Sequence, residues 1–423
     1  MDRVRKASRL RRWGAFGAVL AVAGLMTACS SSPSSSSTTS TTTAKSAIPT
    51  SLTTSSFNVN FSEMSALKSL TNSGSGLVGV ILPDETSSTR YVDFDAPYLT
   101  KAFTMAGYPT SDFKIDNALG VDATELADAQ ADITEGAKVL VFDPIDSTVG
   151  AEVQSYAQSH GVAVISYDRA TFTGTNTYYV SFNNFKVGQL IGQGFETCVS
   201  SWNVAKPEIF ELDGGEDTDP NAVSFAQGYN SVIWNSQTTP LTAGLTNSKG
   251  YTLVGDQITP GWVNATGATI FTQQYTAHSN INATVEANDG LANAVIGVLK
   301  SKGVGPKKVP TTGQDATLQG MEWILQGYQC GSVYKPIYEE AQDAVALATI
   351  LRAHQTPPKA LVNSTTTPPK NVSGSAQPAS LLTPEWVTSA NMNTTVIKDQ
   401  FISASALCTA VGNSVCTAAG ITP

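Results

Sequence analysis

Residues 138–169 read KVLVFDPIDSTVGAEVQSYAQSHGVAVISYDR and contain one complete strand–helix–strand unit. Mostly apolar runs at 138–142 and 162–167 predict two short buried strands. Between them, apolar residues recur at helical spacing: Val149, Val153, Tyr156 and Ala157. A helix of this length between two buried strands is typical of a crossover in a parallel sheet.

The same alternation extends in both directions from this unit. Further strands are predicted at 77–82, 208–212, 252–254, 283–287 and 308–312, with amphipathic helical patterns between them. Repetition over this length predicts an α/β fold with parallel sheets covered by helices on both faces. With 423 residues, the chain is long enough for two such Rossmann-like lobes.

The N-terminus has the pattern of an export signal. Basic residues up to Arg12 precede a thirteen-residue apolar run at 14–26, which is too short to span a bilayer as a helix. The run is followed by Ala28-Cys29, as in the lipobox of bacterial lipoproteins, where the cysteine is acylated after cleavage. We therefore expect a signal peptide at 1–28 and a lipid anchor at Cys29; the alternative is an ordinary secretory signal.

A tether is predicted after Cys29. From 30 to 43 every residue except Pro33 is Ser or Thr, a composition that cannot build a core, and we expect 29–75 to be disordered. The chain has a formal charge of −9, although six basic residues lie within its first twelve. The mature protein is thus strongly acidic, which argues against nucleic acid as a partner.

Four cysteines remain after the signal: Cys198, Cys330, Cys408 and Cys416. Outside the cytoplasm an even number favours disulfides, and four cysteines allow three pairings. We favour Cys408–Cys416, which closes a short loop, together with Cys198–Cys330, while four free thiols remain the alternative. The spacing does not fit a zinc site, and only three widely separated histidines are present, so we predict no metal and no cofactor.

Polar side chains gather where the predicted strands end. Arg90 follows the first strand, Asp168-Arg169 follow the strand at 162–167, and others follow later strands in the same way. Open α/β sheets bind their ligands at the carboxyl ends of the strands. We therefore expect one ligand site at this shared edge.

These positions carry a family resemblance. The segments Pro83-Asp84, Arg90-Tyr91, VISYDR (164–169), YVSFNN (179–184), Lys186-Val187-Gly188, GDQ (255–257), Gly261-Trp262, AND (287–289), GQD (313–315), VYKP (333–336) and LLTP (381–384) occur in order. Over roughly residues 77–402 the chain resembles the D-xylose-binding proteins within the periplasmic sugar-binding family. The resemblance implies a type 1 periplasmic binding fold, in which two lobes are joined by a hinge that the chain crosses several times.

The resemblance also implies the residues that contact a sugar: Arg90, Tyr91, Asp168, Arg169, Asp219, Asn221, Trp262, Asn288, Asp315 and Lys335. Ionised Asp only accepts hydrogen bonds and Arg or Lys only donates them, so this mixture can fix both the donor and acceptor roles of hydroxyl groups. Tyr91 and Trp262 are expected to stack on the apolar faces of the ring. Asp143-Pro144 departs from the family pattern, because it places a carboxylate where we expect a less polar residue.

The lobes implied are 76–181 plus 336–364 and 182–335 plus 365–405, followed by a tail at 406–423. The expected function is that of a lipid-anchored, extracytoplasmic, monomeric solute-binding protein that delivers D-xylose or a similar pentose or hexose to an ABC permease. A sensor that presents sugar to a receptor is one alternative. A lipid-anchored glycosidase is another, but cations beside Asp168, Asp219 and Asp315 would hold them ionised and leave no general acid. We therefore predict no enzymatic activity and no catalytic residue.

Overall fold

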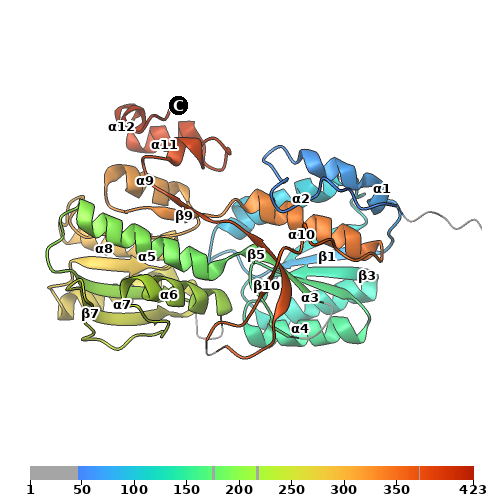
Figure 1. Cartoon of the computed structure of the whole chain (residues 1–423), viewed down its shortest axis with the longest axis horizontal. Helices are drawn as coiled ribbons and strands as arrows, with labels where there is room; N and C mark the ends of the chain where they lie inside the picture. The colour runs from blue at the N-terminus through green and yellow to red at the C-terminus, as the bar shows by residue number, and fades with distance from the viewer. Residues whose placement is uncertain (1–45, 174–176, 216–218, 371) are drawn as a thin grey trace, which may run out of the picture. The chain divides into compact units, whose positions relative to one another are not determined.

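Two sheets organise the protein, which is described here by a computed structural model for residues 46–173, 177–215, 219–370 and 372–423. The predicted signal peptide, Cys29 and the first part of the predicted tether lie outside these residues. Lys45–Pro423 form one compact unit, which contains both sheets (Figure 1). No helix within the described ranges is long and apolar enough to cross a membrane.

The first lobe is built on a seven-stranded sheet, in the order β10-β11-β5-β4-β3-β1-β2. Its strands are β1 (Leu77–Leu82), β2 (Phe113–Asn117), β3 (Ala137–Phe142), β4 (Ala163–Tyr167), β5 (Thr177–Phe182), β10 (Ser364–Thr366) and β11 (Gln377–Leu382). All neighbours are parallel except β10 and β11. Its helices are α1 (Lys68–Thr71), α2 (Ala96–Met105), α3 (Asp122–Glu135), α4 (Ser147–Ser159) and α10 (Ile337–Arg352).

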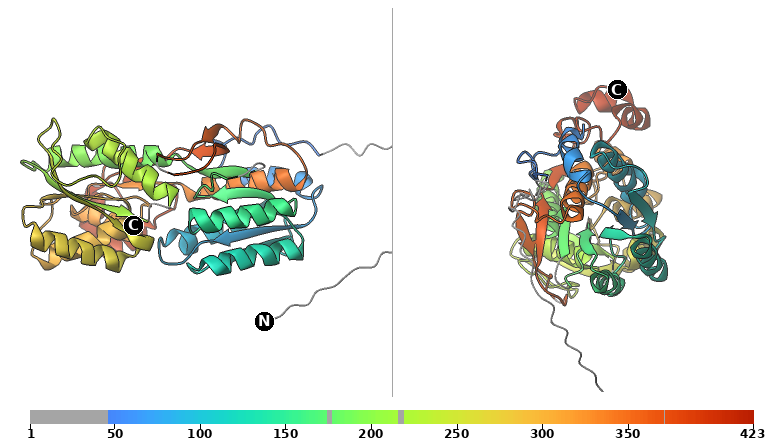
Figure 2. Two further views of the ribbon diagram at one scale, coloured as in Figure 1. Left: turned by 90° about the horizontal axis from the view of Figure 1, so that it is seen from below. Right: turned by 90° about the vertical axis from the view of Figure 1, so that its right-hand side faces the viewer.

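Helices cover this sheet on both faces, as the alternation of its side chains requires. In β3, Val139 and Val141 join the core beneath α2 and α10, whereas Leu140 and Phe142 join the core beneath α3 and α4. Figure 2 shows α3 and α4 side by side along the first lobe. Because both faces are buried, the strand is apolar at nearly every position, which made it recognisable in the sequence.

The second lobe has a three-stranded parallel sheet in the order β7-β6-β8. The strands are β6 (Glu208–Gly214), β7 (Thr252–Thr259) and β8 (Ala283–Glu286), and β9 (Ser332–Tyr334) forms an antiparallel pair with β12 (Glu385–Val387). The helices are α5 (Asn184–Ser201), α6 (Pro220–Ile233), α7 (Asn264–Ala277), α8 (Asp289–Ser301), α9 (Leu318–Gln326), α11 (Ala404–Val411) and α12 (Asn413–Ala418). Short 3-10 segments lie at Ser62–Leu67, Pro260–Trp262 and Met392–Thr394, and a π-helical turn at Tyr91–Asp95.

Within the described residues the chain passes between the lobes three times, from β5 to α5, from β9 to α10 and from β11 to β12. This confirms the predicted type 1 fold with a multi-crossing hinge. Both favoured disulfides are present: Cys198–Cys330, with its Cα atoms 5.7 Å apart, and Cys408–Cys416, at 5.5 Å. The second disulfide links α11 to α12 in the segment that was expected as a tail.

The prediction that 29–75 is disordered is wrong from residue 46 onward. Leu52, Phe57, Phe61, Met64, Leu67 and Leu70 are buried in the core of the first lobe. Gln342 Nε2 on α10 donates to Asn58 O at 2.9 Å, and Gln355 Nε2 donates to Ser46 O at 2.7 Å. Ser, Thr and Asn separate these apolar residues, which follow no single period before Met64, so the sequence pattern resembled a linker.

Two further expectations are corrected. β10 and β11 extend the first sheet, where β11 pairs with β5, although 365–405 was assigned to the second lobe. The strand expected at 308–312 does not form, and Pro310 could donate no N–H bond to a ladder there. The segment is instead held by Thr284 N, which donates to Pro310 O, and by Thr312 N, which donates to Glu286 Oε2.

Candidate functional site

A cavity lies between the carboxyl ends of the strands of the two lobes. All ten residues selected from the sequence line it, together with four that were not selected. The lining is Ser87, Ser88, Arg90, Tyr91, Asp168, Arg169, Asp219, Asn221, Phe225, Trp262, Asn288, Gln314, Asp315 and Lys335. The predicted residues, which span 245 positions of sequence, are therefore brought together in one place.

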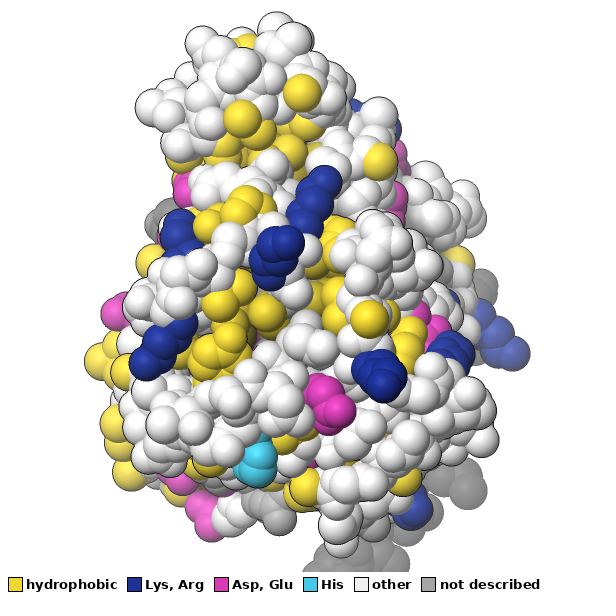
Figure 3. Space-filling model, turned by 90° about the vertical axis from the view of Figure 1, so that its left-hand side faces the viewer, with side chains coloured by type: hydrophobic (Ala, Val, Ile, Leu, Met, Phe, Trp, Pro, Cys, Tyr) yellow, Lys and Arg dark blue, Asp and Glu magenta, His cyan; other side chains and the backbone are white. Residues whose placement is uncertain are grey.

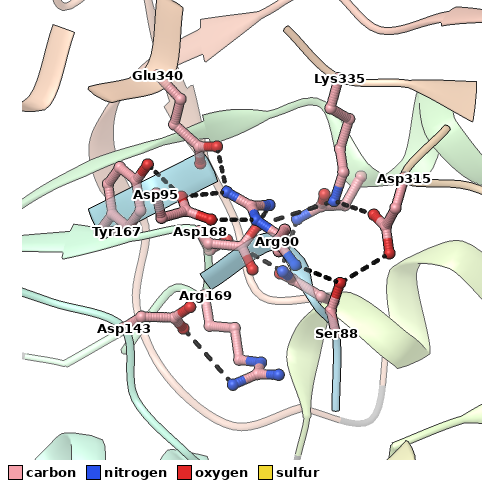
Figure 4. Close-up of polar contacts among 12 residues, drawn as sticks. Ser88, Arg90, Asp95, Asp143, Tyr167, Asp168, Arg169, Asp315, Lys335 and Glu340 are labelled. Carbon is pink, nitrogen blue, oxygen red and sulfur yellow. Dashed lines mark hydrogen bonds and ion pairs between the residues drawn. The ribbon is translucent and has the colours of Figure 1, made fainter. Parts of the chain in front are cut away.

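Arg90 is the centre of the charged network in the first lobe (Figure 4). Its Nη1 donates to Asp168 Oδ1 at 2.8 Å, its Nε and Nη2 donate to Asp95 at 2.8 Å each, and its Nη2 donates to Glu340 Oε2 at 2.6 Å. Burial alone would lower the pKa of Arg90, but the charges of Asp168, Asp95 and Glu340 outweigh it and raise that pKa well above its ordinary value. Arg90 is thus permanently charged and rigidly held.

Asp168 faces the cavity as an ionised acceptor. Burial alone would raise its pKa, but the charges of Arg90, Lys335 and Arg169 outweigh burial and lower it. Tyr91 OH also donates to Asp168 Oδ2 at 3.1 Å. A carboxylate held ionised in this way can accept hydrogen bonds from a ligand but cannot serve as a general acid near neutral pH.

Left-handed backbone conformations recur at the site. Asp168 has φ 55°, Trp262 has φ 58° and Asp315 has φ 87°, each just past a strand or an extended segment. Non-glycine residues in this region cost about 1–3 kcal/mol each and persist only where the surrounding structure imposes them. Here the conformation turns the chain at the strand end so that each side chain lines the cavity.

Asp219 organises the wall of the second lobe. As the N-cap of α6, it accepts hydrogen bonds from Asn221 N at 2.9 Å and Ala222 N at 3.2 Å. Its other oxygen accepts one from Trp262 Nε1 at 2.8 Å. The indole lies against the backbone of Gly214, where a Cβ atom would come within 1.8 Å of Trp262 Cζ3. The absence of a side chain at the end of β6 is therefore what admits Trp262.

Four contacts join the two lobes across the cavity. Asn221 Nδ2 donates to Asp168 O at 3.0 Å, and Ser88 Oγ donates to Asp315 Oδ2 at 3.2 Å. Arg169 Nε lies 3.5 Å from Asp219 Oδ2. Lys335, on the crossing from β9 to α10, lies 3.3 Å from Asp315 Oδ1 and 4.0 Å from Asp168 Oδ1. The two lobes therefore contact each other around the cavity.

Aromatic residues of both lobes line the cavity. Tyr91 is buried, and the guanidinium carbons of Arg90 and Arg169 lie 5.5 and 5.8 Å from the centre of its ring. Phe225, which the sequence reading missed, forms an edge-to-face pair with Trp262 at 6.3 Å in the second lobe. Phe225 follows Asn221 by four residues on α6, so helical spacing could have found it.

The other lining residues outside the ten are Ser87, Ser88 and Gln314. The two serines belong to a turn in which Asp84 Oδ1 accepts from Thr86 N at 2.7 Å and Ser87 N at 2.6 Å. Gln314 is the neighbour of a selected residue, and its buried Oε1 accepts no hydrogen bond from the described residues. The cavity therefore offers an unused acceptor beside the charged groups.

Comparison with known proteins identifies the family of the chain. Residues 78–355 match the periplasmic binding protein domain family. The chain is 33% identical over 294 residues to the D-xylose-binding periplasmic protein of Escherichia coli, an alignment that covers 69% of this chain and 82% of that protein. It is 29% identical to a multiple sugar-binding periplasmic receptor of Rhizobium radiobacter, covering 78% and 92% of the two chains.

A solved structure shares the fold over most of this chain. A carbohydrate transporter solute binding protein of Chloroflexus aurantiacus, in complex with D-glucose, matches with a TM-score of 0.65 and 26% identity, over 78% of this chain and 98% of that one. The chain belongs to the family of periplasmic sugar-binding proteins. Its relatives are solute binders, and the protein is accordingly a binding protein rather than an enzyme.

Proposed function

We propose that the cavity binds one neutral monosaccharide, contacted by the ten residues selected from the sequence. The observation that carries this proposal is the balance of charge in the lining. Arg90, Arg169 and Lys335 face Asp168, Asp219 and Asp315, so the cavity has three cations and three carboxylates. A sugar acid or sugar phosphate would leave its negative charge unmatched, whereas hydroxyl groups can both donate to the carboxylates and accept from the cations.

The apolar side chains of the lining and the relatives narrow the ligand. Trp262 and Phe225 supply apolar surface for the C–H groups of such a ring. Since relatives carry names that refer to D-xylose or to multiple sugars, we propose D-xylose or a similar pentose or hexose.

The proposed role is capture for import. The lobes would close around the sugar because it binds the closed state more tightly than the open one, and the closed protein would deliver it to an ABC permease. We further propose that the protein is extracytoplasmic and monomeric and is anchored by acylated Cys29. The second half of the predicted tether packs on the first lobe, so only residues up to 45 would link the anchor to the folded domain.

A melting experiment tests this function. The domain from residue 46 onward would be melted with D-xylose, L-arabinose, D-ribose and D-glucose, and with D-xylonate as a charged analogue of D-xylose. A sugar at one hundred times its dissociation constant should add about 2.7 kcal/mol of stability. We expect a shift with at least one neutral sugar and none with D-xylonate. A shift with the acid alone would contradict the proposal, and turnover of a bound glycoside would favour a glycosidase.

A further inference from the structure

Asp143 is a buried carboxylate that the proposed function does not use. It directly follows β3, and its backbone N donates to Ile81 O at 3.0 Å, which fixes its position beside β1. Its side chain is fully buried but does not line the cavity. Burying the carboxylate of Asp143 is therefore costly, and the proposed function assigns it no role.

The carboxylate of Asp143 lacks hydrogen-bond donors. Neither of its oxygens has a hydrogen-bond partner among the described residues. The Nη1 atom of Arg169 lies 3.6 Å from Asp143 Oδ1 (Figure 4). Burial raises the pKa of Asp143 well above its usual range, and the charge of Arg169 opposes that rise. Arg169 is thus the group that most favours the ionised form of Asp143.

Arg169 makes fewer and longer polar contacts than Arg90. Its Nη1 donates to Pro144 O at 3.3 Å, and its Nε lies 3.5 Å from Asp219 Oδ2 in the second lobe. Nη1 is therefore directed to Asp143 and Pro144, and Nε is directed to Asp219. Nη2 makes no hydrogen bond among the described residues, so it is the nitrogen of the guanidinium that can still donate to a ligand in the cavity that Arg169 lines.

We propose that Asp143 is a positioning residue, which holds Arg169 against the first lobe so that Nη2 donates to one particular hydroxyl of the sugar. This inference rests on the proposed function and adds to it a determinant of specificity. A guanidinium fixed at two of its nitrogens can reject a sugar that lacks the matching oxygen, because its donor is then left unpaired in a closed cavity. Without Asp143 the guanidinium is free to turn toward Asp219, and that rejection is lost.

Deoxy sugars test the inference. The neutral sugar that shifts the melting of the wild type most would be titrated, together with its monodeoxy analogues, into the wild type, Asp143→Asn, Asp143→Ala and Arg169→Lys. We expect the wild type to lose at least about tenfold in affinity when the hydroxyl bound by Arg169 is absent. In all three variants that penalty should fall below about threefold, while the penalties for the other hydroxyls stay. Asp122→Asn, an exposed change in the same lobe, should behave as the wild type.

Two outcomes would overturn the inference. One is that Asp143→Asn and Asp143→Ala weaken binding of the sugar and all of its analogues by the same factor, as a purely structural role requires. The other is found without ligand, in a double-mutant cycle of urea unfolding for Asp143→Ala and Arg169→Lys. We expect the folded-to-unfolded ratios to show coupling of about fivefold, and additive effects would contradict the inference.

The ligand-free cycle also separates this inference from the proposed function. If no neutral sugar binds the wild type, the proposed function fails, whereas the cycle still shows whether Asp143 holds Arg169. If sugar binds but the two residues do not couple, the inference fails and the proposed function stands.

Discussion

Asn221 Nδ2 donates a hydrogen bond of 3.0 Å to Asp168 O, which ties the first turn of α6 in the second lobe to the end of β4 in the first. Both residues line the cavity. The bond can form only when the lobes are together, so its energy contributes to closure and therefore to the apparent affinity for the ligand.

Replacing Asn221 by Ala should consequently weaken sugar binding about five- to tenfold, since one such hydrogen bond contributes about 1 kcal/mol. Calorimetric titration measures the change. Ser224→Ala on the same helix is the matched control, because its Oγ donates only to Pro220 O at 2.8 Å and does not line the cavity. Equal affinities for Asn221→Ala and the wild type would show that the bond does not contribute to closure.

Arg90 is expected to be essential for stability as well as for binding. Arg90→Met leaves the buried carboxylates of Asp95, Asp168 and Glu340 without their shared partner. Removing one member of a buried ionic network costs about 3–5 kcal/mol, which urea unfolding at neutral pH would measure. Lys138→Met, at an exposed position of the same lobe, should change stability by less than about 0.5 kcal/mol. A loss for Arg90→Met as small as that of the control would show that the network is not coupled to folding.

Gly214 should be required for the position of Trp262. A Cβ atom in Gly214→Ala would lie 1.8 Å from Trp262 Cζ3, so the indole must move and its hydrogen bond to Asp219 must lengthen or break. We expect sugar affinity to fall more than tenfold and the tryptophan emission to shift. Gly297→Ala on α8 is the control, because its Cβ would meet nothing within 4 Å; it should be neutral or slightly stabilising. Unchanged affinity in Gly214→Ala would contradict the assigned role of Trp262.

Stability should decrease as the pH rises through the neutral range. Burial raises the pKa of Glu286 from 4.5 to about 8, so the folded state holds a proton that the unfolded state releases near pH 4.5. The contribution of this group is complete below pH 4.5 and is lost as the pH rises to about 8. Glu286→Gln should remove up to about 1.4 kcal/mol per pH unit from the slope of the unfolding free energy over that window.

Urea unfolding of Glu286→Gln between pH 5 and 9 measures this slope. The exposed Glu385→Gln serves as the control and should leave it as in the wild type. An unchanged slope in Glu286→Gln would mean that Glu286 is ionised in the folded protein.

The segment before β1 should stabilise the first lobe. Phe61 is fully buried in that core, and Phe61→Ala should cost about 3–5 kcal/mol in urea unfolding. Ser55→Ala, at an exposed position of the same segment, should have no measurable effect. A disordered segment would instead give the same small effect for both changes.

The sequence predicted the parts of the fold that local patterns determine. The strand at 77–82 is apolar at successive positions because helices cover both faces, and Asp168 and Asp315 could be selected because they follow predicted strands or extended segments. The burial of Phe57 and Phe61 was not predicted, because apolar residues spaced irregularly among Ser and Thr show no helix or strand period. They pack in the core that also contains residues of α2 and α10, and this core is visible only in the folded structure. The pairing of β11 with β5 likewise depends on the chain returning to the first lobe after α10, and the residues of β11 alone do not indicate this.

The site shows the same division. The ten selected residues are those that the family resemblance implies, and most of them follow predicted strands, but their partners across the cavity depend on how the lobes meet. Ser88 was missed because its role consists of a bond to Asp315 of the other lobe, 227 positions away. Figure 3 shows basic, acidic and apolar side chains interspersed over this end of the second lobe. This face of the surface therefore does not indicate a ligand site.

Calorimetric titration of the domain from residue 46 onward with D-xylose, L-arabinose and D-glucose tests whether the cavity binds a neutral monosaccharide. We predict saturable binding of at least one of these sugars, with one site per chain and a dissociation constant in the micromolar range or tighter, about −8 kcal/mol. We also predict that Arg90→Met and Gly214→Ala weaken it. Absence of binding to every neutral monosaccharide tested, or binding unaffected by both changes, would show that the cavity is not a sugar site.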